Sequence, residues 1–325
     1  MTSPAITSPR PDFLRPGVLL PWLAGVGLLA YVFIAGGYLV TVLSFAAIYA
    51  VFVTGLNFFM GYTGQVSFGQ NAFAAIGGYT SAILTTKGWP VFAAMPVGIV
   101  AAALLALAIG YPTLRLRGHY LAMATLALGL IVQEIAVQWD SVTQGYTGIS
   151  GIPGLGAFGW ELPNDRAQLA ALLVALGLCI WISSRLKHSR LGHALAAIAG
   201  SEDAARALGI DVARYKLLAF VIAAVYAAFS GSLFVHFVGF VSPEVFGLHM
   251  VVLGFTMLYV GGIGTVFGPL VGAFIISLLP ETFRGFKDYQ DLAYGAALIA
   301  LLIYAPKGLA SLARFLPGRK PGEGA

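Results

Sequence analysis

The sequence predicts an all-α polytopic membrane protein with about ten membrane segments, or about eight if the shortest are re-entrant. Three observations support this fold class. Hydrophobic residues make up 59% of the 325 residues and charged residues only 10%, compared with about 25% in soluble domains. The mean hydropathy is +0.88. Charge-free runs long enough to cross a bilayer recur along the chain, and the longest extends from Gly17 to Thr86.

The expected elements begin with a disordered, cytoplasmic, Pro- and Ser-rich N-terminus at residues 1–16. The apolar run behind it is too long for the core of a signal peptide, so we expect an uncleaved first span. The membrane domain is expected to cover residues 17–312, followed by a cytoplasmic tail at 313–325. The expected spans, in chain order, are 17–36, 38–60, 71–86, 90–110, 119–139, 167–184, 214–238, 246–260, 266–280 and 290–305.

Some of the expected spans are short enough to be re-entrant. Segments 246–260 and 266–280 flank "GGIGTVFGP" and could form a hairpin, and segment 71–86 is also short. The glycine and apolar spacing of Gly61–Gly69 partly recurs at Gly261–Gly268. This echo indicates either an internal repeat, which is common in transporters, or chance agreement among small residues.

The basic residues predict the orientation of the spans. With both termini cytoplasmic, fourteen of the eighteen Lys and Arg residues fall on the cytoplasmic side, as the positive-inside rule requires. The loop 140–166 then lies outside. The net charge of +5 therefore reflects membrane orientation, and nucleic acid is not an expected partner.

Catalytic and metal-binding functions lack the residues they need. Cys179 is the single cysteine, and the five histidines show no H-x-x-x-H spacing, so no disulfide or metal site is expected. The sequence has no G-x-x-x-x-G-K-[ST] motif and no nucleophile–base pair at membrane depth. We therefore expect no catalytic residues, no cofactor and no enzyme activity in this chain.

The decapeptide "GYTGQVSFGQ", from Gly61 to Gln70, places polar residues and three glycines inside the longest charge-free run. Backbone that is not helical at membrane depth must be buried in protein or line a water-filled cavity. The glycines argue against a regular helix, so we expect an irregular segment that lines a solute pathway. The alternative is close helix packing without a ligand. The candidate residues are Gly61, Gly64, Gln65, Ser67, Gly69, Gln70 and Asn71.

Glu134 is a charged residue inside an expected span, roughly 8 Å from the outer end of that span, and Gln138 lies one turn further along the same helix face. Charged residues within spans are functional candidates by default, although Glu134 is near enough to the membrane surface to extend toward water instead. A route with so little fixed charge suits a solute of zero net charge. A zwitterionic amino acid, a sugar and urea all meet this condition.

Residues 185–216 predict two short helices at the cytoplasmic surface of the membrane. Ser189 and Ser201 are suited to cap the N-termini of these helices. Gly200 and Gly209 are suited to terminate them, because glycine readily adopts the left-handed conformation found after a helix end. The loop is therefore expected to contain a sharp turn between two helices.

The second of these helices, about seven residues long, would be marginal alone in water. Glu202 and Arg206 are four residues apart and are expected to pair on one face. Ala204, Ala205 and Leu208 are expected to form an opposite apolar face, which fits either a groove in a partner or the chain's own membrane domain. The candidate contact residues are Gly192, Ser201, Glu202, Ala204, Ala205, Leu208 and Gly209.

The same loop resembles the coupling loop of ABC-importer permeases, whose motif is E-A-A followed at a distance by G. Glu202, Ala204, Ala205 and Gly209 are similar to this motif in shortened form, with Asp203 as an extra residue. Longer stretches, in the same order, resemble branched-chain amino-acid permeases of the LivM type. They are "GYTGQVSFGQNAFAAIGGYTSAIL", "LRLRGHYLAMATLALGLI", "YTGISGIPGL", "RALGIDVARYKLLAFVIAA" and "GGIGTVFGPLVGA".

This resemblance implies a permease subunit of an ATP-driven importer of branched-chain amino acids in the bacterial inner membrane. The implied partners are the lipid bilayer, a sister permease of the LivH type, two ATP-binding subunits and an extracytoplasmic substrate-binding protein. Importers of urea and short amides resemble the same family, so these solutes are a second possible substrate class. An ion-coupled secondary transporter, which usually needs coupling-ion sites in the membrane, and an intramembrane enzyme are the competing functions from different classes.

Overall fold

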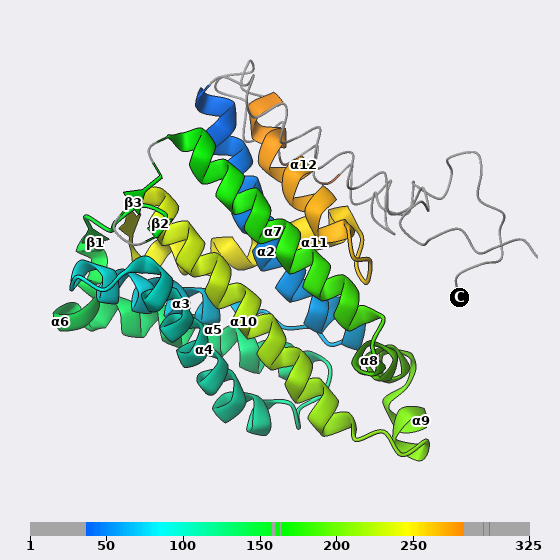
Figure 1. Ribbon diagram of the computed structural model, residues 1–325. Coiled ribbons are helices and arrows are strands. Elements are labelled where there is room, and N and C mark those ends of the chain that lie inside the picture. Colours follow the sequence, from blue (N-terminus) through cyan, green and yellow to red (C-terminus); the bar gives the residue numbers. More distant parts are fainter. Residues whose placement is uncertain (1–36, 158–159, 163, 283–294, 296–298, 300–325) are drawn as a thin grey trace, which may run out of the picture.

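A computed structural model of the chain describes residues 37–157, 160–162, 164–282, 295 and 299. These residues form a bundle of helices with short strands at one end (Figure 1). The expected N-terminal region 1–16, the span 17–36 and the tail 313–325 lie outside the described residues, as does the span 290–305 except at residues 295 and 299. The all-α class expected from the hydropathy is confirmed for the described part of the chain.

The longer helices of the described residues follow the expected spans in order. They are α2 (Gly37–Thr63), α3 (Gln70–Thr86), α4 (Val91–Thr113), α5 (His119–Gln138), α7 (Asp165–Lys187), α10 (Val212–Val238), α11 (Leu248–Gly261) and α12 (Gly268–Thr282). Within this part of the chain, six stretches are long and apolar enough to cross a membrane, namely α2, α4, α5, α7, α10 and Pro243–Gly261. The protein is therefore a multi-pass membrane protein, and α3 and α12 are its shorter apolar helices, with 17 and 15 residues.

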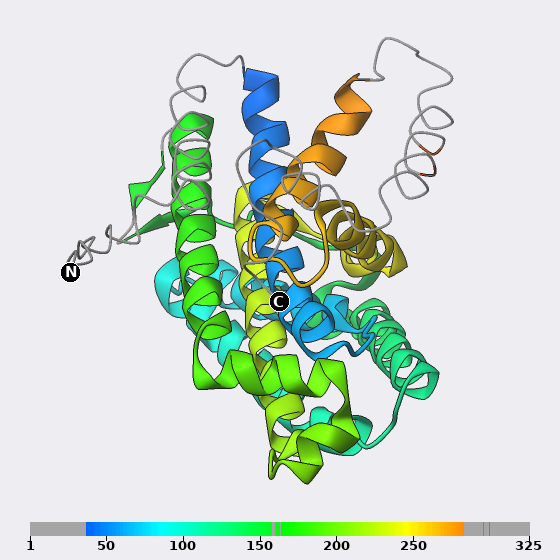
Figure 2. The ribbon, with the colours of Figure 1, turned by 90° about the vertical axis from the view of Figure 1, so that its right-hand side faces the viewer.

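Shorter elements lie at the two ends of the bundle. At one end are α8 (Arg190–Gly200) and α9 (Glu202–Ala207), and α8 runs crosswise to the long helices (Figure 2). Toward the other end are α6 (Asp140–Thr143), the 3-10 helices η2 (Gly145–Thr147) and η3 (Pro243–Phe246), and four two-residue strands. The strands are β1 (Ile149–Ser150), β2 (Gly156–Ala157), β3 (Trp160–Glu161) and β4 (Phe240–Val241).

The segment between α5 and α7 is anchored to the end of α10. Strands β1 and β4 pair antiparallel with Ile149 opposite Val241, while β2 and β3 form a separate antiparallel pair. Nδ1 of His236, near the end of α10, lies 2.8 Å from the carbonyl oxygen of Pro153. A carbonyl can only accept, so Nδ1 donates this bond and Nε2 accepts one from the Ser81 hydroxyl at 2.7 Å. The expected loop 140–166 is thus tied to the bundle by side-chain and strand contacts.

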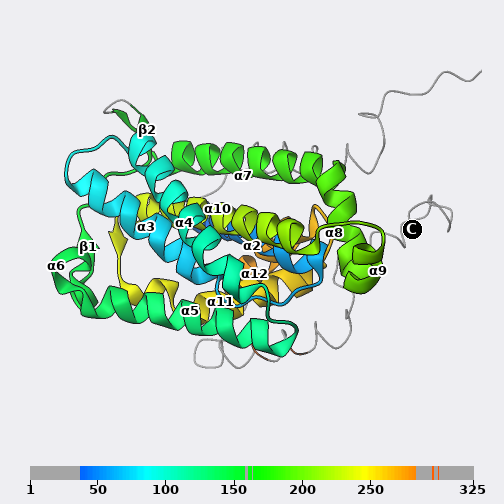
Figure 3. The ribbon, with the colours of Figure 1, turned by 90° about the horizontal axis from the view of Figure 1, so that it is seen from below.

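Helices α2 and α10 form the centre of the bundle. In the most apolar stretch of each, 72% of the residues are buried, whereas the share is between 22% and 33% in α4, α5 and α7. Figure 3 shows α2 and α10 between α7 on one side and α5 on the other. The outward residues of α4 include Val97, Val100, Leu104 and Leu107, a purely apolar surface that suits lipid tails.

Small residues allow α3 and α10 to approach each other closely. A Cβ added to Gly231 would overlap the carbonyl oxygen of Ala74, and one added to Gly77 would lie 2.5 Å from Cα of Ala228. The Ser232 hydroxyl donates a hydrogen bond to the Gly77 carbonyl at 3.0 Å. Such packing of small residues, supported by interhelical hydrogen bonds, is how membrane helices associate without a hydrophobic driving force between them.

Candidate functional site

The turn between α8 and α9 has the local structure that the sequence predicts. Helix α8 ends at Gly200, and the Ser201 hydroxyl accepts a hydrogen bond from the Ala204 backbone N–H at 3.3 Å, which caps α9. Gly209 follows α9 with a φ of +81°, a left-handed conformation that is strained for other residues. The predictions for Ser201 and Gly209 are confirmed. Ser189 precedes α8 as predicted, but its hydroxyl donates to the Leu186 carbonyl and does not cap the helix, and Gly200 ends α8 without a left-handed conformation.

Gly192 allows α8 to turn sharply away from α7. An added Cβ would overlap the Lys187 carbonyl oxygen and lie 2.7 Å from that of Leu186. No larger side chain fits without moving one of the two helices. Gly192 therefore sets the direction of α8 relative to α7.

The predicted apolar face of α9 is divided in two. Ala205 is 2% exposed, whereas Ala204 is exposed and Leu208 is 80% exposed. The chain after Gly209 folds back over α9, and the backbone N–H of Ile210 donates to the Ala205 carbonyl at 3.1 Å. The expectation of one continuous apolar face is wrong because the chain itself covers Ala205, which leaves only the outward side, with Leu208, open to a partner.

The predicted pairing of Glu202 with Arg206 is also wrong. Arg206 instead lies 3.4 Å from Asp203, and both of these side chains are exposed. Glu202 turns inward to Lys216, whose side chain is 3% exposed. A buried ammonium group depends on an anionic partner far more than a solvated guanidinium does, so the distant lysine prevails over the local arginine.

Glu202 is the centre of a polar cluster that joins four segments of the chain. Its Oε1 accepts hydrogen bonds from Lys216 Nζ, at the start of α10, and from Gln65 Nε2 at 2.9 Å. Its Oε2 lies 3.9 Å from Nε of Arg117, in the link between α4 and α5. We call Gln65, Arg117, Glu202 and Lys216 the Glu202 cluster. It connects the decapeptide directly to the α8–α9 loop.

The first half of the decapeptide continues α2, which extends to Thr63. The expectation of irregular backbone at Gly61 is therefore wrong. The missing side chain of Gly61 instead gives room to Gly264, whose backbone N–H would lie 2.7 Å from an added Cβ. The neighbouring Asn57 accepts from that N–H at 2.8 Å and donates to the Thr265 carbonyl at 2.7 Å. The two glycine-rich motifs that echo each other in sequence thus lie side by side.

The second half of the decapeptide is the irregular segment that the sequence predicts. Gly64 has a φ of +70°, and an added Cβ would be 3.6 Å from Cα of Ala199 in α8. An added Cβ at Gly69 would lie 2.5 Å from the carbonyl oxygen of Thr125 in α5. The Phe68 backbone N–H donates to the Thr125 hydroxyl at 3.1 Å. The segment therefore contacts α8 at its first residue and the middle of α5 at its last residues.

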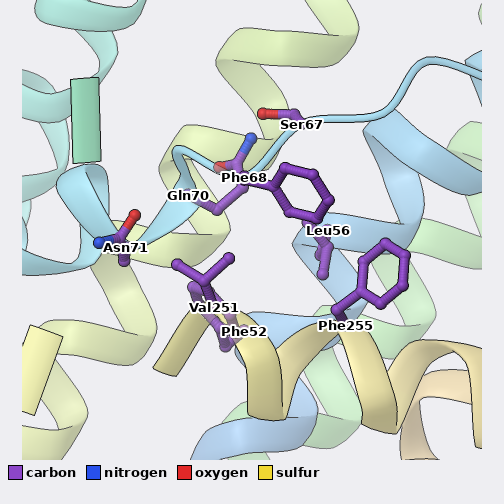
Figure 4. A pocket seen from close by; sticks show the side chains of 8 residues that line it. All are labelled: Phe52, Leu56, Ser67, Phe68, Gln70, Asn71, Val251 and Phe255. Atoms are coloured by element: carbon purple, nitrogen blue, oxygen red, sulfur yellow. The ribbon is translucent and has the colours of Figure 1, made fainter. Parts of the chain in front are cut away.

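A cavity lies where the decapeptide meets α3 and α11. It is small, with a volume of about 10 Å³, and Figure 4 shows the side chains around it. The polar lining consists of Ser67, Gln70 and Asn71, all at most 2% exposed. The apolar lining consists of Phe52, Leu56, Phe68, Val251 and Phe255.

Several polar atoms at this cavity have no hydrogen-bond partner among the described residues. They are the Ser67 hydroxyl, both atoms of the Gln70 amide and Oδ1 of Asn71. The other amide atom of Asn71, Nδ2, donates to the Phe246 carbonyl at 2.8 Å. Buried polar groups are nearly always paired, so a cluster of unpaired ones points to a site where something else binds.

Glu134 lies on the outward face of α5, where Gln138 donates a hydrogen bond to it at 2.6 Å. The predicted sharing of a helix face by these two residues is confirmed. This face differs from the outward face of α4, which carries only apolar residues at Val97, Val100 and Leu104. The outward side of α5 is also largely apolar, with Met123 and Ile131 exposed, and Glu134 and Gln138 form a polar pair near its end.

Sequence reasoning missed Asn57, Arg117 and Lys216 as site residues. Arg117 and Lys216 carry basic charges and were counted only toward membrane orientation. The available signal was the position of Lys216 directly before the apolar run that begins at Leu217. A lysine that is buried there needs a partner.

Comparison with known proteins identifies the family. Residues 38–305 match the family described as "Branched-chain amino acid transport system / permease component". The permease protein LivM of the high-affinity branched-chain amino acid transport system of Escherichia coli K12 is 33% identical over 85% of this chain and 70% of that protein. The LivH permease of the same organism is 27% identical over 80% of this chain and 90% of that protein. The ribose import permease protein RbsC of that organism is 28% identical over 64% of this chain and 67% of that protein. The matched range includes every element of the site described above, and the chain belongs to the family of permease components of branched-chain amino-acid transport systems.

Proposed function

We propose that this chain is the LivM-type subunit of an ATP-driven importer that moves branched-chain amino acids across the bacterial inner membrane. Permease subunits of this family are not enzymes, so ATP is hydrolysed by other chains of the complex. The observation that carries the proposed mechanism is the hydrogen bond between Gln65 and Glu202, because it links the signature segment of the membrane domain to the α8–α9 loop.

The proposed partners are a sister permease of the LivH type, two ATP-binding subunits and an extracytoplasmic substrate-binding protein. The similarity of this chain to LivH as well as to LivM supports the first of these. Two related permeases can pack about a pseudo-twofold axis. The outward face of α5 is proposed to face this axis. A carboxylate that faced lipid would cost about 3 kcal/mol at the centre of the membrane and less near its surface, and Glu134 lies one turn from the end of α5.

We place the α8–α9 end of the bundle in the cytoplasm and the β1–β4 end outside, with both termini cytoplasmic. Basic residues at the α8–α9 end support this orientation, among them Arg185, Lys187 and Arg190. In this arrangement the outward side of α9, with Leu208, is available to an ATP-binding subunit. Movement of α9 reaches the decapeptide through Glu202 and Gln65, and it reaches α10 through Lys216.

Cysteine labelling tests this orientation. Asn164→Cys and Leu208→Cys, each introduced into a Cys179→Ala background, are expected to react with a membrane-impermeant thiol reagent from opposite sides. Asn164→Cys should be labelled in intact cells, and Leu208→Cys only after the membrane is opened. Labelling of both positions from the same side would contradict the proposed orientation.

The substrate class is tested by uptake. The complete complex, reconstituted in proteoliposomes with its binding protein, is expected to accumulate L-leucine only when ATP is supplied on the side of the ATP-binding subunits. Urea and ribose, the latter the solute named for the related ribose permease, are the comparison solutes. Uptake of urea without uptake of leucine would contradict the proposed substrate class. Leucine uptake driven by an ion gradient without ATP would contradict the proposed energy source.

A further inference from the structure

The cavity beside Ser67, Gln70 and Asn71 is not explained by coupling to ATP hydrolysis. Leaving a buried hydrogen-bonding group unpaired costs about 1–3 kcal/mol. Asn57 provides a comparison, because it is equally buried and both of its amide atoms are paired with backbone groups of Gly264 and Thr265. The bundle can therefore satisfy a buried amide, and it does so at Asn57 but not at Gln70.

The unpaired groups at the cavity include both donors and acceptors and carry no charge. The Ser67 hydroxyl can donate or accept, and the Gln70 amide offers one N–H₂ donor and one acceptor. Oδ1 of Asn71 is an unpaired acceptor that lies beside Gly129 of α5. Donors suit a carboxylate and acceptors suit an ammonium group. Such a set complements both charged groups of a zwitterion and leaves no net charge behind when the solute departs.

The remaining walls of the cavity are apolar and suit an aliphatic side chain. They come from α2 through Phe52 and Leu56, and from α11 through Val251 and Phe255. In Figure 4 the Ser67 hydroxyl and the Gln70 amide lie on one side of the cavity, and the apolar groups line the rest. A sugar would place hydroxyl groups against these apolar walls without hydrogen-bond partners, so its chemistry fits the cavity less well.

The cavity is closed to a solute of this size in the present conformation, with room for about one water molecule. The rings of Phe68 and Phe255, 5.4 Å apart between centroids, are its least buried walls. Phe68 lies three residues from Gln65, which is bonded to Glu202. Separation of these two rings would enlarge the cavity.

We propose that Ser67, Gln70 and Asn71 form the polar half of a transient binding site for an aliphatic zwitterionic amino acid, and that the apolar walls form the other half. The site opens when Phe68 moves away from Phe255. This inference rests on the proposed function, because it assigns the contacts by which that importer would recognise its solute within the membrane.

The experiment compares Gln70→Met and Ser67→Ala with the control Asn57→Leu. Each complete complex is reconstituted with its binding protein, and ATP-dependent uptake of radiolabelled L-leucine is measured beside thermal unfolding. Gln70→Met removes groups that have no partner within the protein, so the unfolding temperature should stay the same or rise, whereas uptake should fall about tenfold. Asn57→Leu removes paired groups and should lower the unfolding temperature.

A second measurement uses Ser67→Cys in a Cys179→Ala background. Leucine should slow its reaction with a small thiol reagent during turnover, and it should not change the reaction of Ser44→Cys, a buried position whose native hydroxyl is bonded within its own helix. Normal leucine uptake by the Gln70→Met and Ser67→Ala variants would contradict the proposed binding site but not the proposed importer function. Equal destabilisation by Gln70→Met and Asn57→Leu would also contradict the proposed site, because it would show that the Gln70 amide is paired with a structural water. Absence of leucine uptake by the native complex would instead overturn the proposed function.

Discussion

The segment from Gly64 to Asn71, irregular as far as Gly69 and helical from Gln70, buries polar groups in opposite ways at its two ends. At one end Gln65 is bonded to Glu202, which in turn holds the buried Lys216. At the other end Ser67 and Gln70 are more deeply buried, yet their side-chain polar atoms have no partner among the described residues. A satisfied buried network fixes the parts that it joins, whereas an unsatisfied group is available to a ligand. The comparison separates a mechanical connection from a binding surface within a few residues.

Glu202→Leu is expected to have the largest effect, because it breaks the satisfied end of this comparison. The substitution leaves the Lys216 ammonium group buried without its carboxylate, and breaking a buried ion pair in this way costs about 3 kcal/mol or more. The purified complex should unfold at a lower temperature, and ATP-dependent leucine uptake should be lost. Thermal unfolding and proteoliposome uptake measure the two effects separately.

The double variant Glu202→Leu with Lys216→Met is the control for this prediction. It removes both charges, so most of the lost stability should return, since apolar replacement of a whole buried pair is often neutral. Uptake should stay low because the connection between α9 and the decapeptide is still missing. A single Glu202→Leu variant as stable as the native complex would show that the cluster does not hold α9 in place.

Leu208→Arg tests the outward side of α9 against its buried side. Leu208 is 80% exposed, so the substitution should leave the permease folded but weaken its association with the ATP-binding subunits about 30-fold, or about 2 kcal/mol. Ala205→Arg, at a buried position, should instead lower the unfolding temperature. Co-purification of the ATP-binding subunits distinguishes the two variants. Normal co-purification with Leu208→Arg would show that the ATP-binding subunits do not contact α9 at Leu208.

Hydropathy and local helix signals were enough to predict the long helices of the described residues and the Ser201 cap of α9. Both depend on residues close together in the sequence, such as Ser201 and Ala204. The partner of Glu202 could not be predicted in the same way. Local spacing favours Arg206, whereas the observed partner, Lys216, becomes available only when α10 packs beside the loop.

The cavity shows a second limit of prediction. The sequence marked Ser67, Gln70 and Asn71 as candidates for the pathway, but it did not indicate that Phe52 and Val251, from distant helices, complete the walls. It also could not show that Gln65, in the same decapeptide, is bonded to the α8–α9 loop. Neighbouring residues of an irregular segment can face different surroundings, because no helical or strand period relates their directions.

Gln65→Leu is expected to have an intermediate effect. It removes one hydrogen bond to a carboxylate that keeps its bond to Lys216, so the loss of stability should be about 1.5 kcal/mol. Uptake should fall several-fold while ATP hydrolysis continues, because the signal from α9 no longer reaches the decapeptide. The ratio of leucine transported to ATP hydrolysed is the measurement. An unchanged ratio would mean that Lys216 and α10 carry the coupling without Gln65.

Asp203→Ala is expected to have the smallest effect, although Asp203 is next to Glu202 and carries the same charge. Its pairing with Arg206, at 3.4 Å, involves two exposed side chains, and such pairs contribute at most about 0.5 kcal/mol. Thermal unfolding, leucine uptake and co-purification of the ATP-binding subunits should therefore match the native complex, and Arg206→Ala should behave alike. Two adjacent carboxylates would then differ through burial alone, which places the function of this turn in the inward-facing Glu202. Reduced co-purification with unchanged stability would contradict this, because it would mean that the first turn of α9 also contacts a partner and that the outward surface extends from Leu208 to Asp203.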